Sequence, residues 1–153
     1  MQNLESTIDL LNDLIIVNND RAEGYESAAV EAKDLALTGL FEAMARDSRK
    51  LSSELSLEVA LSGKDASTGT STAGKIYRAW INIKSKLIKG DKFAILNSCE
   101  EGENIALEAY ESVLRLKTQI SDDLVLKLIE QKNHITEGLQ TVIKLRDTVY
   151  ANA

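Results

Sequence analysis

Hydrophobic positions recur every three or four residues along most of the chain, which is the spacing of one face of an α-helix. This spacing predicts a first helix over residues 3–33 and a second over residues 37–59, which ends at Gly63. Residues 63–72 are polar and rich in Ser and Thr, and they lack the period, so we expect a long loop there. The pattern is typical of an all-α protein.

The third helical segment, over residues 76–87, is interrupted at Gly90 and Asp91 before the spacing resumes over residues 95–114. A last helix follows Ser121 and two acidic residues, which suit a helix start. Two closely joined helices, a long connection and two more helices describe the ferritin-like four-helix bundle with one crossover. We therefore expect one ferritin-like domain over residues 1–153, with the crossover between the second and third helices and the third helix broken near Gly90.

The composition supports the all-α class and argues against nucleic acid and membrane as partners. The 153 residues include no Pro and only 5% aromatic residues, which disfavours an all-β fold. A net charge of −6 argues against nucleic-acid binding, and no apolar run is long enough for a signal core or a membrane span, so we expect a cytoplasmic protein. A basic stripe, residues 75–92, holds six basic residues against one acidic residue. It is either a solvated helix face or a docking surface for an acidic partner.

Polar residues interrupt the apolar faces near the middle of the predicted bundle. Oxidase bundles of this class hold two metal ions between a Glu from each of two helices and a Glu-x-x-His from each of the other two. Asn18 and Ser48 lie near the centre of their apolar faces, and Glu103 lies about 50° from the centre of its own. Gln131 and His134 form an imperfect Glu-x-x-His on the last helix. Residues 37–59 supply no His and no inward carboxylate, so a complete two-metal site is not expected.

Two interpretations of these polar residues follow, and a small-ligand pocket is a third. In the first, they form a polar core layer that satisfies its own hydrogen bonds and fixes helix register. In the second, a reduced site binds a single divalent metal ion, iron or manganese, through Glu103, Gln131 and His134, with Glu26 and Glu100 at its flanks. The residues of the polar core layer are Asn18, Ser48, Ser52, Glu103 and Gln131.

The residues with reactive or aromatic side chains are expected to pack in the core and not to take part in catalysis. Cys99 lies on an apolar face without a basic neighbour, which is typical of a packed thiol. Trp80 is expected to pack in the core, with anchoring of a partner as the alternative. Tyr25 and Tyr110 occupy matching positions in two similar five-residue segments, so we expect them to pair across the bundle with their hydroxyls on polar partners.

Four segments together resemble a bacterial family of uncharacterised ferritin-like four-helix-bundle proteins, classed as a domain of unknown function. They are Asn-Asn-Asp-Arg-x-x-Gly-Tyr-Glu at residues 18–26, Gly-Lys-x-Tyr-Arg-Ala-Trp at 74–80, Ser-Cys-Glu-x-Gly-Glu at 98–103, and the late His134 followed by Leu145-Arg146-Asp147. The resemblance spans nearly the whole chain. It implies the ferritin-like fold and a cytosolic bacterial protein, and it supplies no activity.

The sequence therefore predicts a bundle that is not an enzyme and acts by assembly or binding, since nothing completes a catalytic set. We expect a homo-oligomer, with a dimer favoured, and no cofactor, nucleic acid or membrane. The alternative function is an atypical metal-binding oxidoreductase or storage protein that uses the reduced site.

Overall fold

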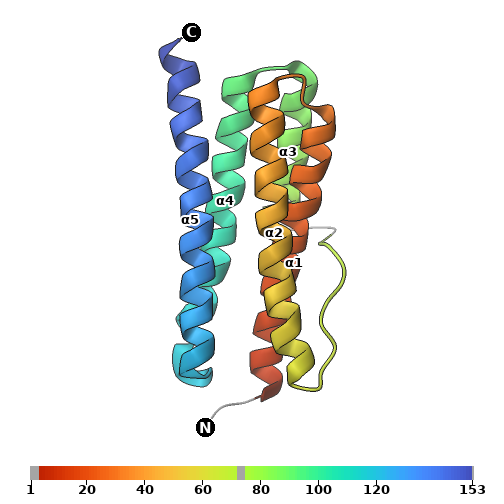
Figure 1. Ribbon diagram of the computed structural model, residues 1–153, viewed down its shortest axis with the longest axis vertical. Helices are drawn as coiled ribbons and strands as arrows, with labels where there is room; N and C mark the ends of the chain where they lie inside the picture. Colours follow the sequence, from red (N-terminus) through yellow and green to blue (C-terminus); the bar gives the residue numbers. More distant parts are fainter. Residues whose placement is uncertain (1–3, 72–74, 153) are drawn as a thin grey trace.

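The computed structural model describes residues 4–71 and 75–152, with the side chains of Leu4 and Lys75 left aside. The described residues form α-helices and one short 3-10 helix and contain no strand, which confirms the all-α prediction (Figure 1). None of these helices is both long and apolar enough to cross a membrane. The elements are α1 (Leu4–Glu31), α2 (Leu35–Leu61), α3 (Lys75–Lys89), α4 (Lys92–Leu114), η1 (Lys117–Gln119) and α5 (Asp122–Ala151).

The helices run alternately along one long axis. α1 and α2 form an antiparallel pair, as do α4 and α5, and the crossover with α3 returns the chain to the end of the bundle where α4 begins (Figure 1). Side-chain caps start three of the helices: Asp34, Asp91 and Ser121 each accept a hydrogen bond from the backbone N–H three residues later. Because each cap satisfies an otherwise unpaired N–H, these residues fix where α2, α4 and α5 begin.

The interruption predicted near Gly90 is present, but it reverses the chain. Gly90 has a φ of 73°, in the left-handed region that glycine tolerates without strain. Its N–H closes the last turn of α3, and Asp91 caps α4 immediately afterwards. α3 therefore packs beside α4 and against α1 as a separate helix, instead of forming the first half of one broken helix (Figure 1).

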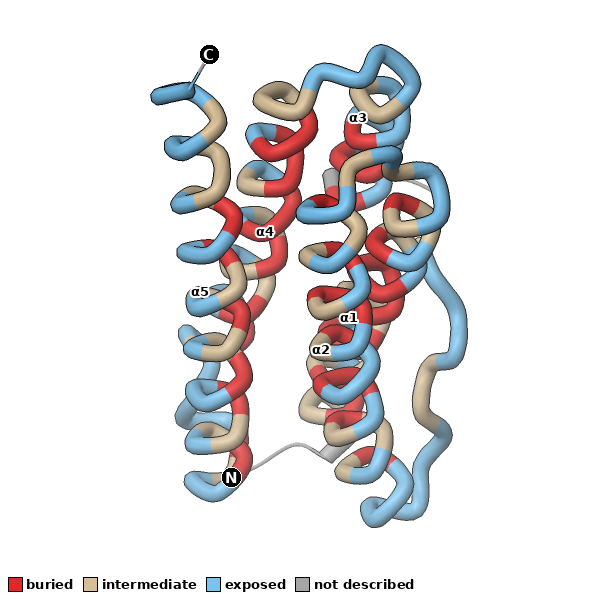
Figure 2. Tube along the Cα trace, turned by 45° about the horizontal axis from the view of Figure 1, so that its top comes forward, coloured by how far each residue is buried: buried red, intermediate tan, exposed pale blue. Residues whose placement is uncertain are grey.

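The buried side chains form two hydrophobic clusters, one in each half of the bundle. One cluster gathers around Tyr25, Phe41 and Trp80, and the other gathers around Leu14 and Leu128. Figure 2 shows that the buried positions of each helix face the interior and that the outer faces are exposed. Between the two clusters, the buried positions of α1 and α2 are mostly polar.

Polar side chains on α1 hold the crossover loop against the bundle. Asn12 Oδ1 accepts a hydrogen bond from Ser67 N at 2.8 Å, and Asn19 Nδ2 donates one to Gly69 O at 3.0 Å. These two asparagines are seven residues apart on α1, so they lie on one face and meet successive parts of the loop. The loop follows a defined path, although its sequence has no helical period.

Asp20 binds Ser71, the last described residue of the loop, and makes the stability of the folded state depend on pH. Its carboxylate accepts hydrogen bonds from Ser71 N at 2.8 Å and from Ser71 Oγ at 2.6 Å. Burial raises the pKa of Asp20 above 3.8 and outweighs the opposing effect of the Ser71 hydrogen bonds. The folded state therefore binds this proton more readily than the unfolded state, and the ionised carboxylate costs stability as the pH rises above 3.8.

We expect Asp20→Asn to remove this cost, because the amide oxygen still accepts from Ser71 N and the side chain no longer titrates. The free energy of unfolding of Asp20→Asn, relative to the wild type, should increase between about pH 4 and about pH 7. Urea unfolding at both pH values measures the change. A difference that stays constant or decreases would contradict the assignment.

Candidate functional site

A buried ion pair joins α1 to α4 in the middle of the bundle. Arg21 and Glu103 are 2% and 1% exposed. Arg21 Nη2 lies 3.0 Å from Glu103 Oε2, and Arg21 Nε donates to the same oxygen at 3.1 Å. The other oxygen, Glu103 Oε1, accepts hydrogen bonds from the Tyr25 hydroxyl and from Arg21 Nη2. Both carboxylate oxygens are therefore taken up by protein donors.

Hydrogen bonds extend this pair to the remaining long helices. Arg21 Nη1 donates to Asn18 Oδ1 at 2.8 Å, and Asn18 Nδ2 donates to the Tyr110 hydroxyl oxygen at 2.8 Å. The Tyr110 hydroxyl donates to Gln131 Oε1 on α5 at 2.7 Å. Gln131 Nε2 then reaches α2, where it donates to a backbone carbonyl and to a Glu54 oxygen, both at 3.2 Å. We call these six residues, Asn18, Arg21, Tyr25, Glu103, Tyr110 and Gln131, the central network.

The electrostatics of the central network keep its donors protonated. Burial alone would lower the pKa of Arg21, but the adjacent Glu103 carboxylate raises it, so the guanidinium stays charged. Burial raises the pKa of Tyr25 well above 10.0, and the charge of Glu103 raises it further. Burial also raises the pKa of Tyr110 to about 12. At neutral pH both phenols therefore donate the hydrogen bonds described above.

Asn18, Gln131 and Glu103 belong to one network, but Ser48 and Ser52 do not join it. Ser48 is fully buried and donates to the carbonyl of Met44 in its own helix at 2.7 Å. Ser52 donates to Asn19 Oδ1 at 2.6 Å and so links α2 to the side of α1 that holds the crossover loop. The predicted polar residues thus divide between the central network, one bond within α2 and one bond between α1 and α2.

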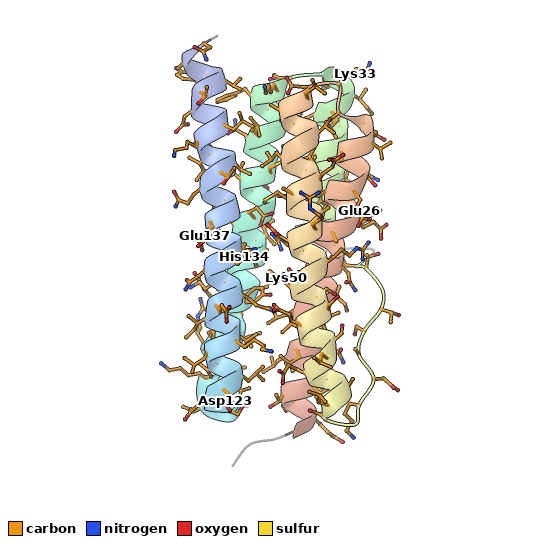
Figure 3. All side chains as sticks on the ribbon, in the orientation of Figure 1. Glu26, Lys33, Lys50, Asp123, His134 and Glu137 are labelled. Carbon is orange, nitrogen blue, oxygen red and sulfur yellow. The ribbon has the colours of Figure 1, made fainter. Side chains whose placement is uncertain are left out.

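His134 lies apart from this network. Its side chain on α5 is 38% exposed, with Nε2 3.5 Å from Asp47 Oδ1 and Nδ1 3.9 Å from Glu137 Oε2 (Figure 3). Of the two flanking carboxylates expected from the sequence, Glu26 pairs with Arg49 on the surface, and Glu100 pairs with Arg146. Within residues 4–71 and 75–152, no group of three His, Cys, Asp or Glu side chains could hold a metal ion.

The oxygens expected to bind a metal ion in the middle of the bundle already accept hydrogen bonds from protein donors. A metal ligand needs a free lone pair directed at the ion. Both oxygens of Glu103 already accept from Arg21 and Tyr25, and Gln131 Oε1 accepts from Tyr110. A guanidinium, which offers no lone pair, carries the positive charge there instead.

Arg21 is the site residue that the sequence pattern did not predict. Carboxylates and His were the expected carriers of chemistry, and a charged Arg is rarely fully buried unless it is paired. The signal was present in the sequence: Arg21 lies three residues after Asn18 and four before Tyr25, on the inward face of α1. The two tyrosines place their hydroxyls on polar partners as expected, but their rings have other neighbours, and Tyr25 packs against Phe41 and Trp80.

Cys99 is fully buried in the cluster around Tyr25, and burial raises its pKa. Because the thiolate is the reactive form, we expect iodoacetamide to leave Cys99 unmodified in the native protein at neutral pH and to alkylate it fully in denaturant. Intact-mass spectrometry reads both states. Rapid alkylation of the folded protein would show that the thiol is accessible.

The fold and the site define an all-α bundle with a closed ionic and hydrogen-bonded network between its helices. Residues 6–116 match the family described as Domain of unknown function (DUF2383), and the chain belongs to that family. The match spans α1–α4 except the first residues of α1, and it includes Arg21, Glu103 and both network tyrosines, whereas Gln131 and His134 lie beyond it. A search of curated proteins finds no match.

Proposed function

We propose that this protein is a ferritin-like bundle that acts without catalysis, through assembly or binding, in the bacterial cytoplasm. The observation that carries the proposal is the Arg21–Glu103 pair: a fixed guanidinium stands where an oxidase of this class would need metal ions. The helix order supports the ferritin-like part, because two antiparallel pairs are joined by one crossover that runs along the bundle (Figure 1).

In this proposal the central network specifies how the helix pairs fit together. A buried ion pair contributes little net stability compared with apolar packing, but it penalises every arrangement that leaves one charge without its partner. The chain of bonds from Glu103 to Gln131 touches all four long helices, so a shifted helix would leave buried groups unpaired. This is a structural role, and it leaves the outer surface for partners.

Assembly is supported by large apolar side chains on the surface. Val30 and Leu35, at the turn between α1 and α2, are 86% and 92% exposed, and Leu61 and Leu126 are also largely exposed. Burying such residues against a second copy would stabilise a pair. Light scattering across micromolar concentrations should give twice the 16.8 kDa of one chain. A mass of one chain throughout that range would exclude the dimer.

A single divalent ion at Glu103, Gln131 and His134, in an iron or manganese oxidoreductase or storage protein, is the alternative function. It would require Arg21 and Tyr25 to release Glu103, and His134 to turn away from Asp47. The two proposals differ in a simple measurement, because an ion that binds only the folded state raises the unfolding midpoint. We expect Fe(II), Mn(II) or Zn(II) to leave the midpoint of metal-free protein unchanged. An increase that the Glu103→Ala, His134→Ala double variant lacks would support the metal site.

A further inference from the structure

A groove lies between α1 and α2, which run antiparallel side by side (Figure 1). Its volume is about 510 Å³, and its lining includes two small side chains, Ala29 of α1 and Ala45 of α2. Val30 lines the α1 side of the groove and is 86% exposed. Because small side chains let helix axes approach closely, a third helix can pack along this groove against Val30.

Two charged side chains of the groove have no ionic partner. Glu42 and Arg46 are exposed and lie one helical turn apart on the outer face of α2. Neither forms an ion pair with another residue that the structure describes, whereas Glu26 and Arg49, which also line the groove, pair with each other. The groove therefore offers one free charge of each sign.

A face with free charges of both signs can be complementary to itself. In a dimer with a two-fold axis, the residue that contacts a given position of the second copy is contacted in turn by the same residue of that copy. When two α2 helices pack antiparallel about an axis between Glu42 and Arg46, each Glu42 lies opposite the Arg46 of the other copy. The outer face of α3 lacks this property, because the charged residues of α3 are all basic and two such helices would repel each other.

We infer that a second copy of this chain docks in the groove between α1 and α2, with the two α2 helices antiparallel. The inference rests on the proposed function and names the interface of the proposed assembly. Val30 of each copy packs against the α2 helix of the other copy and is thereby removed from water. The charges select the antiparallel direction, because a parallel pair would place Glu42 opposite Glu42 and Arg46 opposite Arg46.

Charge reversal tests this interface. Glu42→Arg places an arginine opposite each Arg46, and Arg46→Glu places a glutamate opposite each Glu42, so each variant alone should dimerise about ten-fold more weakly or worse. In an equimolar mixture of the two variants every arginine faces a glutamate, so the mixture should recover the wild-type dimer mass. Light scattering across micromolar concentrations measures the mass, and far-UV circular dichroism checks that both variants are folded. Folded variants that stay monomeric in the mixture would overturn the antiparallel arrangement.

Two further variants provide the control and separate this inference from the proposed assembly. Glu130→Arg and Lys144→Glu reverse exposed charges on α5 outside the groove, so they should leave the dimer unchanged, alone or mixed. A wild-type dimer that both Glu42→Arg and Arg46→Glu leave intact would overturn the groove as the interface, while the assembly itself would stand. A wild type that stays at the mass of one chain would contradict the assembly and this interface together.

Discussion

Arg21→Met is expected to lower the free energy of unfolding by about 3–5 kcal/mol, which is a large effect for a single substitution. The variant keeps an apolar side chain of similar length but leaves the Glu103 carboxylate buried without a cation. Chemical denaturation of the variant and the wild type measures this loss.

A second substitution separates the effect of the unpaired Glu103 charge from the effect of changed packing at residue 21. Glu103→Leu together with Arg21→Met should recover part of the lost stability, because no buried charge is then unpaired. The recovery is incomplete, since the Tyr25 hydroxyl and Asn18 Oδ1 lose their partners in the network. Arg49→Met is the matched control, because its pair with Glu26 is about half exposed and should contribute about 1 kcal/mol or less. Equal losses for Arg21→Met and Arg49→Met would show that the buried pair has no special role.

Gly24→Ala is expected to cost about 1–3 kcal/mol, because its Cβ would overlap the Trp80 ring and α3 would have to move away from α1. Trp80 is buried in this contact, so its fluorescence should also shift to longer wavelength as the ring becomes more exposed. Denaturation and the emission spectrum of the single Trp measure the two effects independently.

Gly39→Ala provides the control for the glycine substitution. Gly39 also lies in a helix, but a Cβ there would have no neighbouring atom within 4 Å. The exchange should therefore stabilise α2 by about 0.5–1 kcal/mol, the usual gain of Ala over Gly within a helix. Gly24→Ala that stabilised the protein in the same way would contradict the close contact between α1 and α3.

Most of the helices could be predicted because their signals are local. The three-to-four spacing of apolar residues is set by helix geometry, and Ser121 and Gly90 mark helix ends through bonds that each makes within a few residues. The direction of α3 could not be read in this way. A glycine with positive φ ends a helix, but whether the chain then reverses depends on packing against α1 and α4, and these contacts are distant in the sequence.

The central network was also predicted only in part, because some of its features are local and others depend on contacts between distant residues. Asn18 and Glu103 could be found because a helical wheel places them among apolar residues, and that test needs only their own helix. Their partners come from other helices: Glu103 meets Arg21 and Tyr25 on α1, 82 and 78 residues away. Periodicity carries no information on which helix faces which, so it left both a metal ion and a polar layer open as interpretations of Glu103.

Arg21 determines how the polar residues around it are interpreted, because it supplies the positive charge that Glu103 needs. Carboxylates that face inward in a bundle need a counter-charge, and either a metal ion or a basic side chain can provide it. A guanidinium provides it without an external ligand and also donates to Asn18. Every member of the network has a hydrogen-bond partner among the described residues, which supports the structural role proposed for it.

Metal content tests this view most directly. Plasma mass spectrometry on untagged protein prepared without oxygen should find no stoichiometric iron, manganese or zinc, in the wild type or in the Glu103→Ala, His134→Ala double variant. A near-stoichiometric metal in the wild type that disappears in the double variant would contradict the closed Arg21–Glu103 network as the role of these residues.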